Sequence, residues 1–192
     1  PKRGDIVIFR FPKDEKIHYV KRCVAVGGDE IIYREKELLL RPHEGDEYIR
    51  ANYDEKDLVE FDGRIFVGKP YEKDHPGVHY DSDGGAYRQL SILMNSNTIA
   101  MIPIISDRLE GFYYKVPNDE FFMVGDNRDN SFDSRFWGSV EYKYIVGKPW
   151  FIYFSWDSDP DLLASDHDKY KIRWNRIGKT VEDLEREARG SI

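Results

Sequence analysis

One short stretch of the chain gathers most of the side chains that could do chemistry. Residues 125–138 read GDNRDNSFDSRFWG and follow the apolar run FFMV at 121–124, so the stretch leaves the end of an expected strand. Carboxylates and arginines alternate in it with small amide and hydroxyl side chains, which form ion pairs and local side-chain-to-backbone hydrogen bonds. Such a segment is usually a self-capped surface turn. Phe136 and Trp137 favour another interpretation, a rigid loop that is anchored on a core and can carry a catalytic group.

The spacing within this stretch does not fit a calcium-binding loop. Counted from Asp126, the third ligand position is Arg128, which cannot bind a cation. Counted from Asp129, the sixth position is Ser134 in place of glycine and the twelfth is Val140 in place of glutamate. We therefore expect no calcium site here.

Composition limits the class of protein. The chain has 192 residues, of which 40% are hydrophobic and 34% charged, so it is globular, and its 15% aromatic content favours β-structure. The net charge is −7 and no basic stripe is present, so we expect no nucleic-acid partner. The single cysteine, Cys23, excludes a disulfide within the chain and a cysteine-based metal site. His75 and His79 lie in a Pro/Gly segment and are interpreted as loop residues, so we predict no metal and no cofactor.

A lysine in the second expected strand is the other candidate for chemistry. The alternation of residues 17–26 places Tyr19, Lys21 and Cys23 on one face of that strand. Strand lysines are usually solvated edge residues. A lysine among apolar neighbours loses its charge more easily, because desolvation disfavours the ammonium form. Lys21 could then act as a general base, since Ser–Lys pairs are a known variant of the Ser–His–Asp arrangement.

Short apolar runs bounded by turn residues predict strands along most of the chain. These runs cover residues 6–11, 17–26, 30–33, 111–116, 120–124, 148–156 and 170–177. The first run is apolar enough to be buried on both faces. Residues 34–111 contain many turn residues between short apolar pieces. This pattern predicts an insert of short strands and loops with one helical turn near 87–93. Residues 157–168 read as an acidic linker, and Thr180 could cap a short helix from 181 to about 189.

Three segments together resemble sequence boxes of bacterial type I signal peptidase, also called leader peptidase. They are residues 4–9 (GDIVIF), residues 19–22 (YVKR) with Gly28-Asp29, and residues 125–138, of which the GDNRDNS-x-DSR run is highly specific. Residues 172–178 (IRWNRIG) are similar to the C-terminal strand of that family. The resemblance covers roughly residues 3–33 and 112–178. The departures, which do not touch the lysine, are Cys23, Ala25, Gly27 and Phe132.

The resemblance implies a mostly β fold and a Ser/Lys-dyad serine endopeptidase. The strand-and-turn spacing predicts that residues 1–33 and 112–178 form one β core, which would be the catalytic one, with an inserted lobe of residues 34–111 and a C-terminal tail or short helix of residues 179–192. The enzyme would remove signal peptides from exported preproteins on the outer side of the cytoplasmic membrane. Its partners would be these signal peptides and the membrane. Independently of the resemblance, Trp150, Ile152, Phe154 and Trp156 share one face of an expected strand; most such faces are core, but an exposed one would suit a membrane interface.

The resemblance also implies the roles of individual residues. Lys21 would be the general base, Ser131 would hydrogen-bond and orient it, and Gly125 would pack close to it. The structural charge pairs would be Arg22 with Asp126 and Asp133 with Arg135. The substrate-binding residues, which would wall shallow pockets for small side chains, would be Ile6, Tyr19 and Val20. The peptide would add as a strand beside residues 17–21.

The nucleophile of that family is a serine upstream of the G-D-I-V strand, after a membrane anchor. This chain begins at Pro1, directly before that strand. We therefore expect the anchor and the nucleophile to precede it, and we expect neither Ser131 nor Ser134 to be the nucleophile. We also expect the chain by itself to be inactive.

Two alternatives remain open. One is a related Ser/Lys processing protease, of conjugative transfer or of the self-cleaving repressor type, although the full GDNRDNS run and the large insert disfavour the repressor. The other is a catalytically inactive β-domain that keeps the scaffold.

Overall fold

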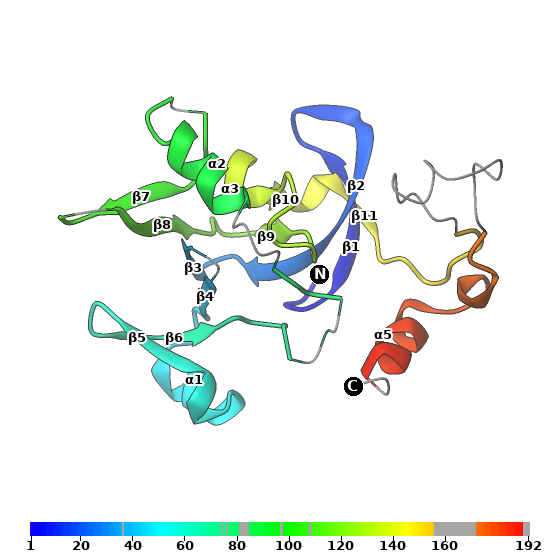
Figure 1. Ribbon diagram of the computed structural model, residues 1–192, viewed down its shortest axis with the longest axis horizontal. Coiled ribbons are helices and arrows are strands. Elements are labelled where there is room, and N and C mark those ends of the chain that lie inside the picture. Colours follow the sequence, from blue (N-terminus) through cyan, green and yellow to red (C-terminus); the bar gives the residue numbers. More distant parts are fainter. Residues whose placement is uncertain are drawn as a thin grey trace, which may run out of the picture. The chain divides into compact units, whose positions relative to one another are not determined.

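The computed structural model describes residues 1–35, 37–73, 75, 77–80, 85–96, 98–107, 109–155 and 172–189. Strands are the dominant element of these residues, which confirms the predicted mostly β class (Figure 1). Contacts divide the chain into two compact units, Pro1–Lys148 and Pro149–Ile192. Each unit is described by itself.

A five-stranded antiparallel sheet positions the candidate site. Its order is β10-β9-β2-β1-β11. The strands are β1 (Ile6–Phe11), β2 (Asp14–Val26), β9 (Glu120–Val124), β10 (Val140–Glu141) and β11 (Ile145–Gly147). The prediction that β1 is buried on both faces is wrong. Val7, Phe9 and Phe11 are buried, whereas Ile6 and the other alternate residues are partly exposed, because only one face of this sheet is covered by the core.

A six-stranded antiparallel sheet contains most of the predicted insert. Its order is β5-β6-β4-β3-β8-β7. The strands are β3 (Glu30–Arg34), β4 (Glu37–Arg41), β5 (Leu58–Phe61), β6 (Arg64–Gly68), β7 (Ile102–Ile105) and β8 (Leu109–Lys115). Helix α2 (Gly85–Leu93) confirms the predicted helical turn. Helix α1 (Asp46–Asn52) and the 3₁₀ turn η1 (Glu55–Asp57) were not predicted.

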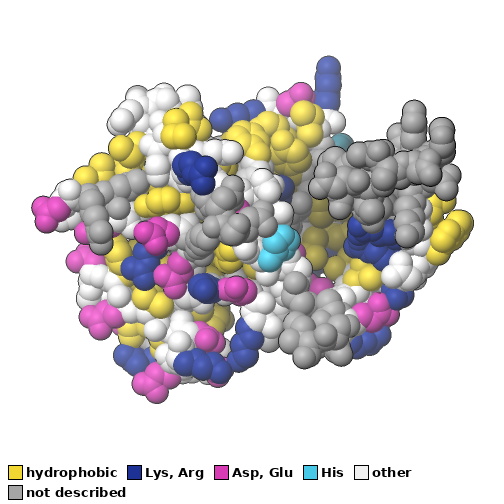
Figure 2. Space-filling model, viewed as in Figure 1, with side chains coloured by type: hydrophobic (Ala, Val, Ile, Leu, Met, Phe, Trp, Pro, Cys, Tyr) yellow, Lys and Arg dark blue, Asp and Glu magenta, His cyan; other side chains and the backbone are white. Residues whose placement is uncertain are grey.

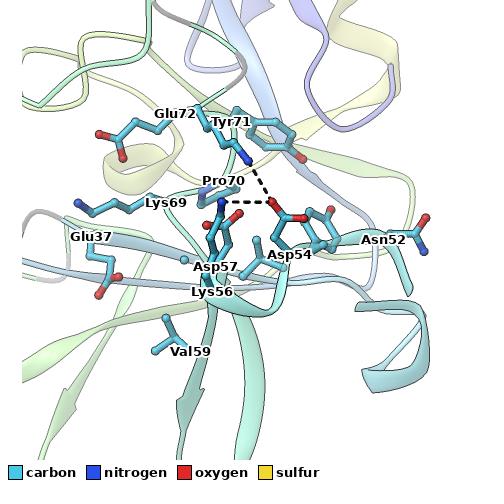
Figure 3. A pocket seen from close by; sticks show the side chains of 14 residues that line it. Glu37, Asn52, Asp54, Lys56, Asp57, Val59, Lys69, Pro70, Tyr71 and Glu72 are labelled. Carbon is cyan, nitrogen blue, oxygen red and sulfur yellow. Dashed lines mark hydrogen bonds and ion pairs between the residues drawn. The ribbon is translucent and has the colours of Figure 1, made fainter. Parts of the chain in front are cut away.

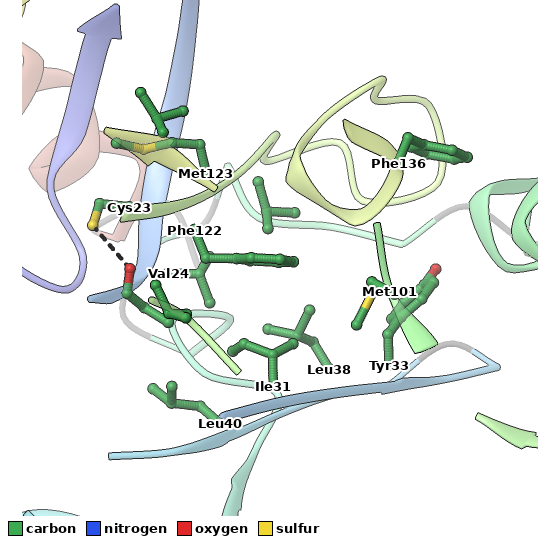
Figure 4. Close-up of a cluster of buried hydrophobic side chains, with 14 of the residues drawn as sticks. Cys23, Val24, Ile31, Tyr33, Leu38, Leu40, Met101, Phe122, Met123 and Phe136 are labelled. Carbon is green, nitrogen blue, oxygen red and sulfur yellow. Dashed lines mark hydrogen bonds between the residues drawn. The ribbon is translucent and has the colours of Figure 1, made fainter. Parts of the chain in front are cut away.

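The main core lies where strands of both sheets meet. Figure 4 shows Val24 of β2, Ile31 of β3, Leu38 of β4 and Phe122 of β9 packed together, and all four are fully buried. Burial of such a side chain contributes about 1.5–3 kcal/mol relative to exposure. A second cluster of Ile32, Leu39 and Phe66 covers the other face of the second sheet, so β3 and β4 are buried on both faces.

The loop after β9 ends in a short helix that is anchored in the core. Helix α3 (Ser134–Trp137) is capped by Asp133, whose side chain accepts a hydrogen bond from the Arg135 backbone amide. Phe136 and Trp137 are buried, as the anchored-loop interpretation requires. The chain then passes through the 3₁₀ turn η2 (Tyr142–Tyr144) into β11.

The second unit differs from its predicted structure. Among the described residues between 149 and 155, only Phe151 has a β-bridge, to Thr180, so the predicted aromatic strand is wrong. Residues 172–177 contain the 3₁₀ turn η3 (Trp174–Arg176) in place of the predicted last strand. One bridge cannot form a ladder, and apolar alternation alone does not supply a strand partner. Residues 156–171, including the predicted acidic linker, lie outside the described residues.

Helix α5 (Val181–Arg189) confirms the predicted C-terminal helix. The Thr180 hydroxyl accepts a hydrogen bond from the Asp183 amide at 3.1 Å, and the Asp183 carboxylate accepts one from the Thr180 amide at 3.2 Å. These reciprocal bonds form the predicted cap.

Candidate active site

The loop after β9 brings a serine to the lysine of β2. Lys21 Nζ donates a hydrogen bond to Ser131 Oγ at 2.9 Å, and it lies 5.6 Å from the centroid of the Tyr19 ring. Lys21 is half-buried. Its apolar neighbours in the sequence had indicated a more deeply buried lysine. The reason is that β9 pairs with β2 only from Arg22 onward, so the edge of β2 beside Lys21 is not covered by β9.

Gly125 allows this close approach. A Cβ atom at position 125 would lie 2.7 Å from Ser131 Cβ and 3.3 Å from Lys21 Nζ. The first distance is shorter than real Cβ contacts, so a side chain here would displace the serine or the lysine. The Gly125 amide donates to Asp133 Oδ2 at 3.1 Å, which ties the start of the loop to its end.

Asp133 and Arg135 form a bidentate ion pair that is fully buried. Arg135 Nε and Nη2 donate to the two carboxylate oxygens of Asp133, each at 2.8 Å. Burial opposes the charge of Asp133, but Arg135 and the Gly125 amide together hold the pKa of the carboxyl group below its ordinary value. A buried pair of this kind fixes the loop, because either charge alone would be costly inside the protein.

Arg22 and Asp126 form the second ion pair. Arg22 Nε and Nη2 donate to the Asp126 carboxylate at 2.9 and 2.8 Å. Arg22 Nη1 also donates to the Gly4 carbonyl at 2.8 Å and lies 3.1 Å from His75 Nδ1. Arg22 is only 2% exposed, so these partners replace the water that its guanidinium would otherwise bind.

The surroundings of Lys21 favour the neutral amine. Burial is the main cause that lowers the pKa of Lys21 below its ordinary value, and the positive charge of Arg135 acts in the same direction. The carboxylates of Asp133 and Asp126 oppose the shift. A neutral lysine amine can accept a proton, which is the chemistry that a general base requires.

The predicted substrate-binding residues lie on two different faces. In the β1–β2 ladder, Ile8 pairs with Val20 and Ile6 with Arg22, so Ile6 and Val20 share a face, whereas Lys21 lies on the opposite one. Tyr19 lies on the lysine face. Val20 is 55% exposed, and hydrophobic side chains gather over the β1–β2 hairpin in Figure 2.

Two further aromatic residues near Tyr19, Phe11 and Phe132, were not predicted as part of the site. The ring of Phe11 lies 5.0 Å from that of Tyr19 and 6.2 Å from that of Phe132, which follows Ser131 directly. Phe132 is exposed. The alternation of Phe9, Phe11 and Tyr19 along paired strands was the signal in the sequence that could have indicated this apolar wall.

The edge of β2 next to the lysine is open. Strand β1 pairs with the other edge of β2 along residues 14–22, and β9 pairs only with residues 22–26. Among the strands that the structure describes, none pairs with this edge between His18 and Lys21. An open edge can accept an extended peptide as an added strand.

The described residues contain one group of side chains spaced to hold a metal ion, namely Asp29, His43 and Glu44. Arg3 already lies among them, with its Nη2 atom 2.6 Å from Asp29, 2.7 Å from Glu44 and 3.1 Å from His43. The guanidinium supplies the positive charge that a metal would bring, so we assign this cluster to a salt-bridge network.

Two cavities lie away from the lysine. One, of about 560 Å³, lies on the insert, where the Asp54 carboxylate is 3.0 Å from the Lys73 ammonium and 3.6 Å from that of Lys56 (Figure 3). The other, of about 880 Å³, is lined by residues that include Arg3 and Phe121. Neither of the two is lined by Lys21 or Ser131.

Comparison with known proteins defines the class. Residues 1–156 match a family model described as signal peptidase, peptidase S26, so the chain is a peptidase. It is 44% identical over 196 residues to signal peptidase I of Helicobacter pylori strain ATCC 700392 / 26695, a match that covers 97% of this chain and 68% of that protein. It is 35% identical over 179 residues to signal peptidase I of Aquifex aeolicus strain VF5, covering 81% of this chain and 64% of that one. The chain therefore belongs to the signal peptidase family, which confirms the resemblance seen in its sequence boxes.

A crystal structure of a signal peptidase I from Enterococcus faecalis V583 aligns with 77% of this chain and 95% of its own. The sequence identity is 20% and the TM-score is 0.39.

Proposed function

We propose that this chain is the catalytic part of an enzyme that removes signal peptides from exported preproteins, with Lys21 as its general base. The observation that supports this proposal is the hydrogen bond between Lys21 Nζ and Ser131 Oγ, which holds a half-buried lysine of lowered pKa at an open strand edge. The matched relatives from Helicobacter pylori and Aquifex aeolicus are both named signal peptidase I, which favours signal peptides over the substrates of conjugative transfer.

In the proposed reaction, the neutral Lys21 amine accepts the proton of a serine hydroxyl while the serine oxygen attacks the carbonyl carbon of the scissile peptide bond. The resulting ammonium then gives its proton to the departing amine, which leaves an acyl-enzyme ester. Lys21 next accepts a proton from a water molecule, whose oxygen attacks the ester carbonyl carbon. As the bond to the serine oxygen breaks and the acid is released, the Lys21 ammonium returns the proton to the serine oxygen. Ser131 orients Lys21, Gly125 leaves the space for this contact, and the two ion pairs hold the loop in place.

We propose that the nucleophilic serine is supplied by residues outside this chain. The Ser134 side chain is fully buried and its Oγ accepts a hydrogen bond from the Met123 amide at 2.8 Å, so it is not available for attack. Ser131 Oγ is the partner of Lys21 and is assigned to orientation. The chain spans 68% of the length of its Helicobacter pylori relative, which leaves room for a further segment that carries the nucleophile.

The signal peptide is proposed to add as a strand along residues 17–21 of β2. Main-chain hydrogen bonds to an open edge would supply affinity, and pockets for alternate side chains would supply selectivity for small residues. Ile6 and Val20 would line one side of the bound strand, and Tyr19 would line the other, next to Lys21.

We further propose that the enzyme works at the outer side of the cytoplasmic membrane. Trp150 is 76% exposed and Tyr153 is 82% exposed, and aromatic side chains with a polar end suit a membrane interface. The chain is proposed to be held there by an anchor in a segment outside it. No helix in the described part of the chain is long and apolar enough to cross a membrane.

The test is cleavage of a preprotein with an Ala-x-Ala site by the complete gene product, purified free of host peptidases. Lys21→Met should abolish cleavage, a loss on the order of 10⁶-fold, and Ser131→Ala should slow it by about 10–100-fold, as loss of an orienting partner does. Lys115→Met, at an exposed lysine of β8, is the matched control and should cleave normally. Wild-type turnover by the Lys21→Met enzyme would remove Lys21 from the mechanism.

The chain from Pro1 to Ile192 should not cleave the same preprotein. Lys21-dependent cleavage by this chain would show that one of its own serines, most plausibly Ser131, is the nucleophile, and the proposed roles would then be wrong.

A further inference from the structure

A segment of the insert lies directly against the loop that holds the lysine. The His79 amide donates to the Asp126 carbonyl at 3.0 Å, and the Arg128 amide donates to the His79 carbonyl at 2.9 Å. His79 and Asn127 thereby form a parallel β-bridge. Val78, between these contacts and His75, is buried in the core. Residues 78–79 of the insert are therefore bonded to the loop that follows Gly125, although the two segments are far apart in the sequence.

His75 brings a side chain of this segment to the Arg22–Asp126 ion pair. Its Nδ1 atom lies 3.1 Å from Arg22 Nη1, while Arg22 Nε and Nη2 bind the Asp126 carboxylate. An arginine can only donate, so His75 must accept through Nδ1. Its ring also lies 5.9 Å from the ring of Tyr71, whose hydroxyl donates to the Val24 carbonyl at 3.3 Å. The histidine is thus held both by the guanidinium and by a tyrosine that is itself bonded to β2.

The two residues of this ion pair are sequence neighbours of residues at the base, so a change in the pair can reach Lys21. Arg22 is the next residue of β2, and Asp126 is the next residue after Gly125, which lies against both Lys21 and Ser131. The Arg22 side chain therefore connects the strand that carries the base to the loop that orients it. Because this guanidinium is almost fully buried, loss of one acceptor weakens the hydrogen bonding that replaces water around it and lets the side chain shift.

We propose that His75 is a positioning residue, which holds the Arg22–Asp126 pair through its Nδ1 acceptor and so keeps Lys21 in register with Ser131. This inference rests on the proposed function of Lys21. It gives the insert a part in the reaction, through one side chain that contacts Arg22, the residue after the base, from outside the sequence boxes that carry the family resemblance.

Loss of the acceptor should be visible at Lys21 itself. The Asp126 carboxylate raises the pKa of Lys21, and Arg22 neutralises that carboxylate at close range. If the pair loosens, the negative charge of Asp126 is less neutralised and the pKa of Lys21 should rise. A rise would leave less neutral amine at a given pH and would move the acid limb of the rate profile to higher pH.

The first experiment titrates Lys21 in the 192-residue chain, with ¹³C-labelled lysine followed by NMR. His75→Phe keeps an aromatic ring beside Tyr71 but removes the acceptor, and should raise the pKa of Lys21. His75→Asn places an amide oxygen near the position of Nδ1 and should restore the wild-type titration. The matched control is His43→Phe, because His43 Nδ1 also lies 3.1 Å from an arginine of a carboxylate pair, Arg3 with Asp29, and should leave Lys21 unchanged.

The second experiment measures cleavage by the complete gene product. His75→Phe should lower kcat by about 10–100-fold with little change in KM, as loss of an orienting partner does, and His75→Asn should return most of the rate. Unchanged titration and kcat in His75→Phe would overturn the inference, and so would an equal defect in His75→Asn, which would show that the ring and not the acceptor matters. A wild-type enzyme without activity would instead refute the proposed function, and the titration would still test the contact.

Discussion

Gly125→Ala tests the packing at the base most directly. The added Cβ would lie 2.7 Å from Ser131 Cβ and 3.3 Å from Lys21 Nζ, whereas ordinary contact begins at 3.4 Å. The serine must therefore retreat by about 0.7 Å, which along the axis of the 2.9 Å hydrogen bond to Lys21 would take it beyond bonding distance. Overpacking of this kind costs about 1–3 kcal/mol of stability, and misplacement of a reacting group by about 1 Å costs about 10²-fold in rate.

The assay compares kcat and KM for preprotein cleavage with the thermal unfolding of the same variants. Gly147→Ala is the matched control, because a Cβ at that strand position meets nothing within 4 Å. We expect Gly125→Ala to lose rate at a temperature where it remains folded, and Gly147→Ala to behave as wild type. A Gly125→Ala enzyme with wild-type kcat would refute the argument that the absent side chain is what permits the Lys21–Ser131 contact.

Three further predictions concern the charges around the base and the C-terminal helix. Asp133→Asn leaves the buried Arg135 without its counter-charge and should cost about 3–5 kcal/mol in urea unfolding; a loss below about 1 kcal/mol would show that the pair is not needed for the fold. The pKa of Lys21 is lower in the folded chain than its ordinary 10.5, so the unfolded chain binds the proton first as pH falls, and the contribution of Lys21 to stability is lost between 10.5 and the lower folded pKa. The Lys21→Met variant does not suffer this loss, so its free energy of unfolding minus that of wild type should be larger at pH 7 than at pH 10.5. Denaturant unfolding at both pH values measures this difference, and an equal difference at both would contradict the lowered pKa. Thr180→Ala removes the cap of α5 and should cost about 1 kcal/mol, seen as faster amide hydrogen exchange in residues 181–184, whereas unchanged exchange would mean that the cap contributes little.

Local patterns in the sequence determined much of this protein. The mostly β class followed from apolar runs between turn residues, and α2 and α5 followed from spacing and from the Thr180–Asp183 cap, because these signals act within a few residues. Two short segments also indicated the candidate catalytic residues, since residues 19–22 and 125–138 contain Lys21, Ser131 and both arginines of the ion pairs.

Tertiary structure decided which faces are covered and what reaches the base. Alternation placed Tyr19 and Lys21 on one face of their strand, but only the pairing of β1 with β2 put Ile6 on the face of Val20. Likewise, only the pairing of β9 with residues 22–26 left Lys21 half-buried beside an open edge. The aromatic run near Trp150 has the composition of a strand, yet within the described residues it has a single bridge, because a strand needs a partner that composition does not provide. The contact of His75 with Arg22 joins residues 53 positions apart, and such a contact depends on how the insert folds back, which no local pattern encodes.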